Sequence, residues 1–247
     1  MTPTVWLKPG ILILYGSSLD AATHKHHALQ IIWPTANVHC TFEDQVISGP
    51  LIINSQVKHQ LQLDAGWVLL VEPKSDLGQQ LLERLADRPA VSIEPIAPLH
   101  HERPTASDDP NQHLAPLCDA LGITLAFAST NSEISDQRIQ QLLSNLHDCL
   151  PDGCLKPASW RATDVAASLF LSESRFLHLF REQMGIAWRP FLLWHRMICA
   201  INAIIKGSSI TNAAHSAGFS DGAHLSRTFR RLFGMSARDS LALFPSR

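Results

Sequence analysis

The chain has 247 residues, enough for two domains of ordinary size. Its composition, 45% hydrophobic and 17% charged, excludes a disordered chain and indicates a sizeable buried core. The net charge of −2 conceals an asymmetry: residues 1–150 hold 8 Lys or Arg against 16 Asp or Glu, whereas residues 151–247 hold 12 against 6. An acidic first part and a basic second part indicate two domains with different partners, and a polyanion is a candidate partner for the second.

Targeting signals and cysteine usage indicate the compartment. The first residues lack the basic region and apolar core of a signal peptide, and no run approaches the roughly 18–20 apolar residues that span a bilayer. Five cysteines, at positions 40, 118, 149, 154 and 199, are scattered and form no CxxC pair. This pattern favours reduced thiols over a disulfide framework or a zinc ribbon. We therefore expect a cytoplasmic protein without a membrane partner.

Short apolar runs separated by turn residues fill the chain from residue 11 to about 72. They predict strands at 11–15, 28–33, 46–53 and 67–71 and, from their spacing, a small β-sandwich or barrel. Leucines at helical spacing predict a helix over 77–88. Six prolines and many polar residues in 89–116 indicate a linker, and from residue 135 the pattern is helical. The fold class expected is α+β, with a sheet domain at 1–90, a linker at 91–133 and an all-α domain at 134–247.

An internal repeat in the last third of the chain is the strongest signal. Residues 165–185 and 213–234 match with an offset of 48 positions, which becomes 49 after one residue is inserted in the turn. Each copy predicts a short helix, a tight turn, and a second helix that begins after Ser172 or after Ser220 and Asp221. Gly185 and Gly234 stand where each second helix should end. A helix from about 189 to 206 connects the two copies.

This pattern is that of a helix-turn-helix, present twice, in which the exposed face of each second helix enters a major groove. The connecting helix would hold the two units about one DNA turn, roughly 34 Å, apart. Arg227 is the preferred candidate for reading a base, whereas Arg230 and Arg231 suit phosphates. The alternative is a helical bundle with no nucleic-acid role. The candidate DNA-binding residues are Ser174, Arg175, Leu177, His178, Arg181, Gly222, Ala223, Ser226, Arg227, Arg230 and Arg231.

Residues 134–245, and above all the segment 218–241, resemble the DNA-binding domain of the AraC/XylS family of bacterial transcription regulators. The resemblance implies double-stranded promoter DNA and RNA polymerase as partners, a homodimer, and more often activation than repression. The chain departs from the family pattern at Phe170, where the first turn usually has glycine, and at Leu177, where a polar reader is common. The residues to which the resemblance assigns base reading are Ser174, Leu177, His178, Gly222, Ala223, Ser226 and Arg227.

The resemblance also implies a cupin-like N-terminal domain that senses an effector and often dimerises. His24 and His26 resemble the HxH of a cupin metal motif, and His59 lies about where its later histidine would fall. Imidazole suits Zn, Ni, Cu and Fe, and HxH on a strand places both rings on one face. The glutamate of the motif is missing, because residues 29–31 are Leu, Gln and Ile. The alternative is a polar strand end with inward histidines hydrogen-bonded in the core, so a divalent transition metal and a small-molecule effector both stay open.

Three functions fit these patterns. The first is a sequence-specific transcription regulator whose N-terminal domain senses an effector. The second is a metal-binding cupin-type protein or enzyme with a helical appendage, and the third keeps the DNA-binding domain but uses the sheet only for dimer or protein contacts. The chain has no pattern of a Ser/His/Asp triad, a P-loop or a dinucleotide fingerprint, so we expect no enzyme and no catalytic residues.

Overall fold

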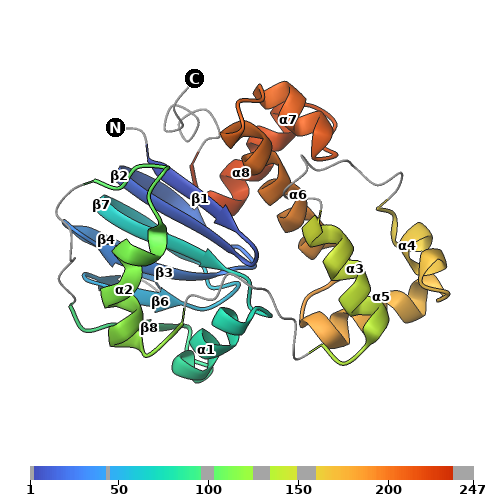
Figure 1. Ribbon diagram of the computed structural model, residues 1–247, viewed down its shortest axis with the longest axis horizontal. Helices are drawn as coiled ribbons and strands as arrows, with labels where there is room; N and C mark the ends of the chain where they lie inside the picture. Colours follow the sequence, from blue (N-terminus) through green and yellow to red (C-terminus); the bar gives the residue numbers. More distant parts are fainter. Residues whose placement is uncertain (1–2, 43–44, 96–102, 125–133, 149–159, 236–247) are drawn as a thin grey trace. The chain divides into compact units, whose positions relative to one another are not determined.

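The computed structural model describes residues 3–42, 45–95, 103–124, 134–148 and 160–235 (Figure 1). The chain divides into two compact units. The first contains all the strands with α1 and α2, and the second contains α3 to α7 and the start of α8. No helix in the described ranges is both long and apolar enough to cross a bilayer.

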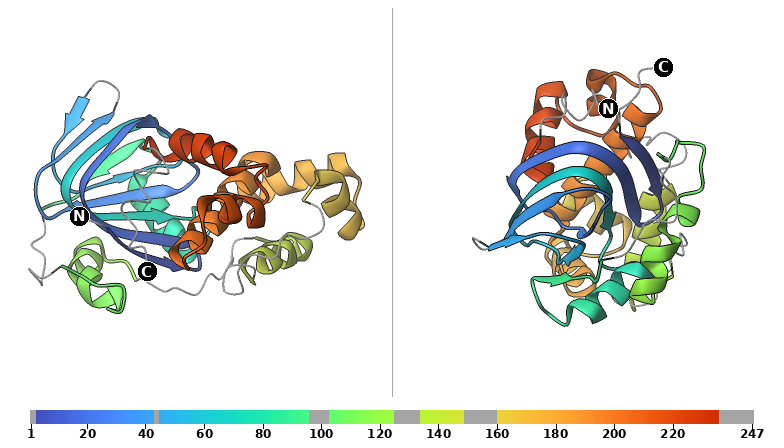
Figure 2. Two further views of the ribbon diagram at one scale, coloured as in Figure 1. Left: turned by 90° about the horizontal axis from the view of Figure 1, so that it is seen from above. Right: turned by 90° about the vertical axis from the view of Figure 1, so that its left-hand side faces the viewer.

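The first unit is built on one antiparallel sheet in the strand order β1-β2-β7-β3-β6-β8, with β4 pairing with β7 and β5. Strand β7 lies beside β2 along its length, and its other edge pairs first with β4 and then with β3. The strands curve (Figure 2), but the ladder of described strands does not close. The β-rich first domain is thus confirmed, as an open sheet. The strands are β1 Thr4–Lys8, β2 Ile11–His24, β3 Leu29–Pro34, β4 Val38–Phe42, β5 Gln45–Ile47, β6 Leu51–Ile53, β7 His59–Val71 and β8 Ala90–Ser92.

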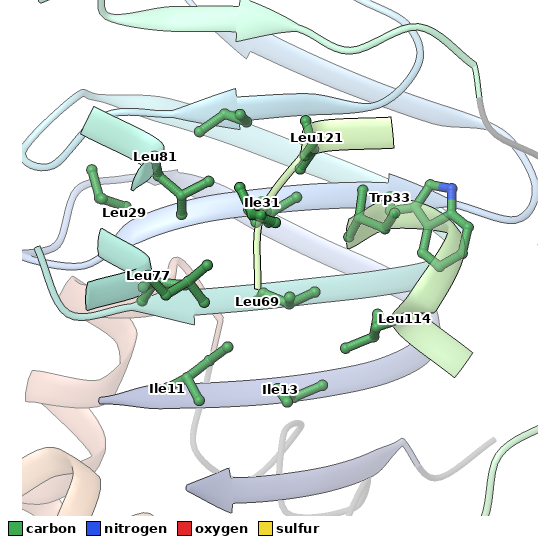
Figure 3. Packing of buried hydrophobic residues seen from close by; sticks show 14 of the residues in the cluster. Ile11, Ile13, Leu29, Ile31, Trp33, Leu69, Leu77, Leu81, Leu114 and Leu121 are labelled. Atoms are coloured by element: carbon green, nitrogen blue, oxygen red, sulfur yellow. The ribbon is translucent and has the colours of Figure 1, made fainter. Parts of the chain in front are cut away.

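Two helices cover one face of this sheet, α1 (Asp76–Leu85) and α2 (Pro110–Leu121). Figure 3 shows Leu77 and Leu81 of α1 and Leu114 of α2 packed over Ile31 and Leu69 of the central strands. All five side chains are buried, and each contributes roughly 1.5–3 kcal/mol of hydrophobic free energy to folding. Trp33 and Trp67 lie in the same cluster, so they pack the sheet as structural residues.

Helix α2 lies within residues 91–133, where a linker was expected. The Asp109 side chain caps it by accepting a hydrogen bond from the Asn111 backbone N–H, and Pro110 occupies the first turn, where its missing N–H has no cost. Leu117 and Leu121 are buried against the sheet. Proline therefore starts a helix here instead of interrupting one, and the first unit extends beyond residue 90.

The strands that the sequence did not predict are polar on one side. Strand β7 begins at His59, well before the apolar run 67–71, because its first half alternates buried and exposed residues. Strands β1, β4 and β8 are likewise short or alternating. The predicted strand over 46–53 is two strands, β5 and β6, separated at residues 48–50.

The second unit begins with α3 (Gln137–Asp148), and its further helices are α4 (Ala162–Ser168), α5 (Glu173–Met184), α6 (Trp188–Ile205) and α7 (Ile210–Ser216). Helix α8 (Gly222–Phe233) starts in the second unit, and its residues from Arg227 onward belong to the first. Helix α3 begins after Asp136, whose carboxylate accepts a hydrogen bond from the Arg138 backbone N–H. The Ser135 backbone N–H and hydroxyl donate hydrogen bonds to the side-chain oxygen of Gln183 on α5.

The described cysteines differ in state. Cys40 on β4 is a buried free thiol, and burial raises its pKa to about 11, which argues against a reactive thiolate. Cys199 on α6 is disulfide-bonded, so the expectation of reduced thiols throughout the chain is wrong at that residue. Cys149 and Cys154 lie outside the described residues.

Candidate nucleic-acid interface and histidine cluster

The first helix-turn-helix consists of α4, a three-residue turn over 169–171, and α5. The Ser172 hydroxyl caps α5 by accepting a hydrogen bond from the Arg175 backbone N–H. Gly185 ends the helix in the left-handed conformation at φ +70°, and its N–H donates to the Arg181 carbonyl. Both predicted caps are confirmed.

The second helix-turn-helix consists of α7, a four-residue turn over 217–220, and α8. The extra turn residue is the insertion that the repeat predicts. The Asp221 carboxylate accepts a hydrogen bond from the His224 backbone N–H at 2.6 Å and so caps α8. Gly234 follows the helix with φ +71°, and its N–H donates to the Arg230 carbonyl. The two copies therefore share caps of the same design.

The first turn carries a strained residue. Phe170 has φ +55° and is 96% exposed, whereas Gly218, its counterpart 48 residues later, has φ +82°. Glycine adopts this conformation without strain, but an L side chain there costs roughly 1–2 kcal/mol. Exposure means that the Phe170 ring recovers little of that cost through packing.

We expect Phe170→Gly to stabilise the chain, by up to about 1 kcal/mol. The relief of strain exceeds the roughly 0.5–1 kcal/mol that glycine costs through its freedom in the unfolded state. Urea unfolding followed by circular dichroism measures the change. Gly218→Ala is the matched control and should destabilise; a lower stability of Phe170→Gly would contradict the argument.

Helix α5 presents the predicted polar face. Ser174, Arg175, His178 and Arg181 are exposed, and three of them recur at positions i, i+4 and i+7 of one helical face. Leu177 differs, because it is half-buried against the core of the second unit. The structure thus gives Leu177 a packing role, while the acidic neighbours of the two arginines, at 173 and 182, reduce the positive charge of this helix.

Helix α8 presents the more cationic face. Ala223, Arg227, Arg230 and Arg231 are exposed at positions i, i+4, i+7 and i+8, and the helix contains no acidic residue. Their spacing places the three guanidinium groups on adjoining parts of one surface. This helix therefore offers the stronger attraction to a polyanion.

Gly222 and Ser226 of α8 are half-buried. A methyl group added at Gly222 would lie 3.4 Å from the Ile210 side chain and 3.6 Å from the Thr211 hydroxyl, so α8 begins close to α7. The Ser226 hydroxyl donates to the Gly222 carbonyl at 2.8 Å and keeps its oxygen as an acceptor. Gly222 therefore allows α7 and α8 to pack closely together.

An aromatic core holds the first helix-turn-helix on the connecting helix. The rings of Phe176 and Phe180 on the inner side of α5 pack against Trp188 and Phe191 of α6, with ring centroids 5.0–5.3 Å apart in the closest pairs. Helix α6 has 18 residues, and so extends about 27 Å. It connects the two helix-turn-helix units directly, as predicted.

The three candidate metal-ligating histidines come together in the first unit. His24 ends β2 and pairs with His59, the first residue of β7, while His26 lies in the turn before β3. Their exposed fractions are 8%, 1% and 4%, and one ring nitrogen of each lies within 4.8 Å of the others. Two segments far apart in the sequence thus converge on one buried cluster.

The cluster includes a residue that sequence reasoning did not assign to it. The Gln30 side-chain oxygen lies 2.9 Å from His26 Nε2 and 3.0 Å from His59 Nε2. Gln30 occupies part of the segment where a glutamate was sought, and it is 2% exposed. The available signal was a polar residue inside the otherwise apolar run of β3.

The cluster is electrically neutral near pH 7. Burial, reinforced by the neighbouring His59, lowers the pKa of His24 to about 4. Burial and repulsion from both other rings lower the pKa of His26 to about 3, and burial lowers that of His59. All three rings are therefore uncharged, the form in which imidazole binds a metal.

Comparison with known proteins shows which class of protein the second part of the chain resembles. The family model described as a helix-turn-helix domain matches residues 165–242. LumQ of Photobacterium leiognathi, a probable transcriptional regulator, is 35% identical over 74 residues, 30% of each chain. The transcriptional activator RhaS of Escherichia coli is 33% identical over 111 residues, which is 44% of this chain and 37% of RhaS. The second part of the chain is thus similar to helix-turn-helix transcription regulators over residues 165–242.

Within this class, the region is similar to the DNA-binding domain of the AraC-type transcription regulators. A crystal structure of apo ToxT from Vibrio cholerae has the same fold, with a TM-score of 0.54, 12% identity, and coverage of 96% of this chain and 98% of ToxT. The matched segments span about a third of the length of the curated relatives. The two-part architecture, a sheet unit followed by a helical unit, is therefore one found in a solved structure.

Proposed function

We propose that the whole chain is a sequence-specific transcription regulator that binds double-stranded promoter DNA, most simply as an activator acting with RNA polymerase. The observation that carries this proposal is the pair of capped helix-turn-helix units with exposed cationic faces, connected by one continuous helix. A helical bundle without a nucleic-acid role has no need of three arginines exposed on one face of α8.

The roles of the arginines follow from their chemistry. A guanidinium group can bind guanine O6 and N7 with two hydrogen bonds, and Arg227 lies near the middle of α8 beside the small residue Ala223, which allows close approach. Arg230 and Arg231 lie in the last turn and suit the phosphate backbone. On α5, Ser174 and His178 are the candidates for reading bases. Arg175 and Arg181 are the candidates for binding phosphates.

The sheet unit is proposed to sense an effector and to provide the dimer contact of a homodimer in the bacterial cytoplasm. An effector that binds one arrangement of the protein more tightly than another changes DNA affinity by the difference in its binding free energy, typically about 1–3 kcal/mol. A sheet that served only for dimerisation would leave DNA binding independent of any ligand.

Selection of DNA from a random pool with the full chain, followed by footprinting, tests the proposal. We expect an enriched site with two protected segments centred about 10–10.5 base pairs apart, one for each helix-turn-helix. Competition with unrelated DNA at fixed salt concentration measures specificity. Enrichment no greater than that of unrelated DNA would overturn the assignment.

A further inference from the structure

The hydrogen bonds of the histidine cluster fix where its protons are. In each ring, Nδ1 faces a backbone carbonyl two residues away: His24 to Ala22 at 2.8 Å, and His59 to Val57 at 3.0 Å. His26 Nδ1 faces the Ala28 carbonyl at 3.0 Å. A carbonyl oxygen only accepts hydrogen bonds, so each Nδ1 must carry a proton.

A neutral imidazole with its proton on Nδ1 has a lone pair on Nε2. The same arrangement, with one nitrogen donating to a carbonyl and the other left as a lone pair, orients histidines that bind metals. The backbone around residues 22–28 and 57–59 thus prepares three Nε2 donors to a cation.

The side-chain oxygen of Gln30 faces two of these lone pairs, those of His26 and His59. The amide oxygen and the two Nε2 lone pairs are all hydrogen-bond acceptors, so they repel one another unless a proton or a cation lies between them. Turning the amide by 180° would instead let its two N–H groups donate to His26 and His59 in the metal-free site. A cation bound by all four groups satisfies every one of them at once.

We propose that the Nε2 atoms of His24, His26 and His59, with the side-chain oxygen of Gln30, form a binding site for a divalent d-block cation. Three imidazoles and one neutral oxygen suit Zn²⁺ and its neighbours, whereas Mg²⁺ and Ca²⁺ prefer sites made of oxygens. The ligand set carries no negative charge. Gln30 alternates between donating protons in the metal-free site and accepting the cation in the loaded one.

The test uses the full chain, stripped with a chelator and loaded with Zn²⁺ or Co²⁺. We expect about one ion per chain after gel filtration, and Zn²⁺ should raise the unfolding temperature while Mg²⁺ should not. His59→Ala should lose the bound ion. His39→Ala, which removes an exposed histidine from β4 of the same sheet, should bind as the wild type does.

Gln30→Glu keeps the shape of the side chain and tests whether residue 30 binds the cation directly. A carboxylate at this place adds a negative charge beside the cation, so Zn²⁺ affinity should rise by about tenfold or more in competition with a chromophoric chelator. Unchanged affinity would remove Gln30 from the ligand set. Substoichiometric metal in the wild type, or full loading of His59→Ala, would overturn the site altogether.

Metal content is measured without DNA, and DNA selection is carried out on the stripped protein. Failure of this site therefore leaves the proposed function intact, and failure of DNA binding leaves the site intact.

Discussion

Arg227→Ala should lower the affinity of the full chain for its selected DNA site by about 1–3 kcal/mol, which is roughly 5- to 150-fold. The exposed guanidinium near the middle of α8 is placed to form two hydrogen bonds with one guanine, and alanine can form neither. The loss should be confined to one base position: variants of the site at that position should bind Arg227→Ala almost equally. Fluorescence anisotropy with a set of single-base variants of the site measures both the loss of affinity and the base position at which it occurs.

Arg230→Ala is the matched control, because it removes the same charge from the same helix one turn later. We expect it to weaken binding to all sequences alike and to reduce the slope of log affinity against log salt concentration by about 0.9. The two variants thus separate base reading from phosphate contact. Identical sequence profiles for Arg227→Ala and the wild type would remove Arg227 from the readers.

Local patterns explain why the helical unit was predictable. Caps such as Ser172 and Asp221 act within one turn, and the apolar stripe of each helix repeats every three or four residues. A repeat in the sequence also reports two copies of the same structure. Phe170 has the positive φ of a position where the family pattern usually has glycine.

The sheet unit was harder to predict because its strands owe their pairing to residues far away in the sequence. Strand β7 begins at His59 through pairing with β2 and β4, and no continuous apolar run marks that start. Helix α2 was hidden by its prolines, although Leu114, Leu117 and Leu121 have helical spacing. Propensity within a short window predicts neither feature, since both depend on tertiary contacts.

The histidine cluster was likewise predictable in its local pattern and unpredictable in its tertiary contacts. Its three histidines were visible as a pattern, but their convergence depends on the pairing of His24 with His59 across two strands. Gln30 was visible only as a polar residue in the otherwise apolar run of β3, in the segment where a glutamate was sought. Its proposed role as a fourth ligand follows from the tautomers that the surrounding carbonyls impose on the rings.

Phe180→Ala should destabilise the helical unit by about 3–5 kcal/mol, a large share of the stability of an ordinary domain. Phe180 has no exposed surface, and its ring packs against Trp188 and Phe191 with centroids 5.0 and 5.1 Å away. Alanine would leave a cavity that rigid aromatic neighbours on α6 cannot fill. Arg181→Ala, the next residue on the exposed face, should change stability by no more than about 0.5 kcal/mol.

Urea unfolding followed by far-ultraviolet circular dichroism measures this difference. The sheet has its own core, formed with α1 and α2, so the loss should appear in the helical signal while Zn²⁺ binding by the histidine cluster persists. Because the cavity lies on the inner side of α5, DNA binding should weaken through misplacement of Ser174 and His178 on the exposed side of the same helix. A wild-type midpoint for Phe180→Ala would mean that the aromatic core does not hold the first recognition helix in place.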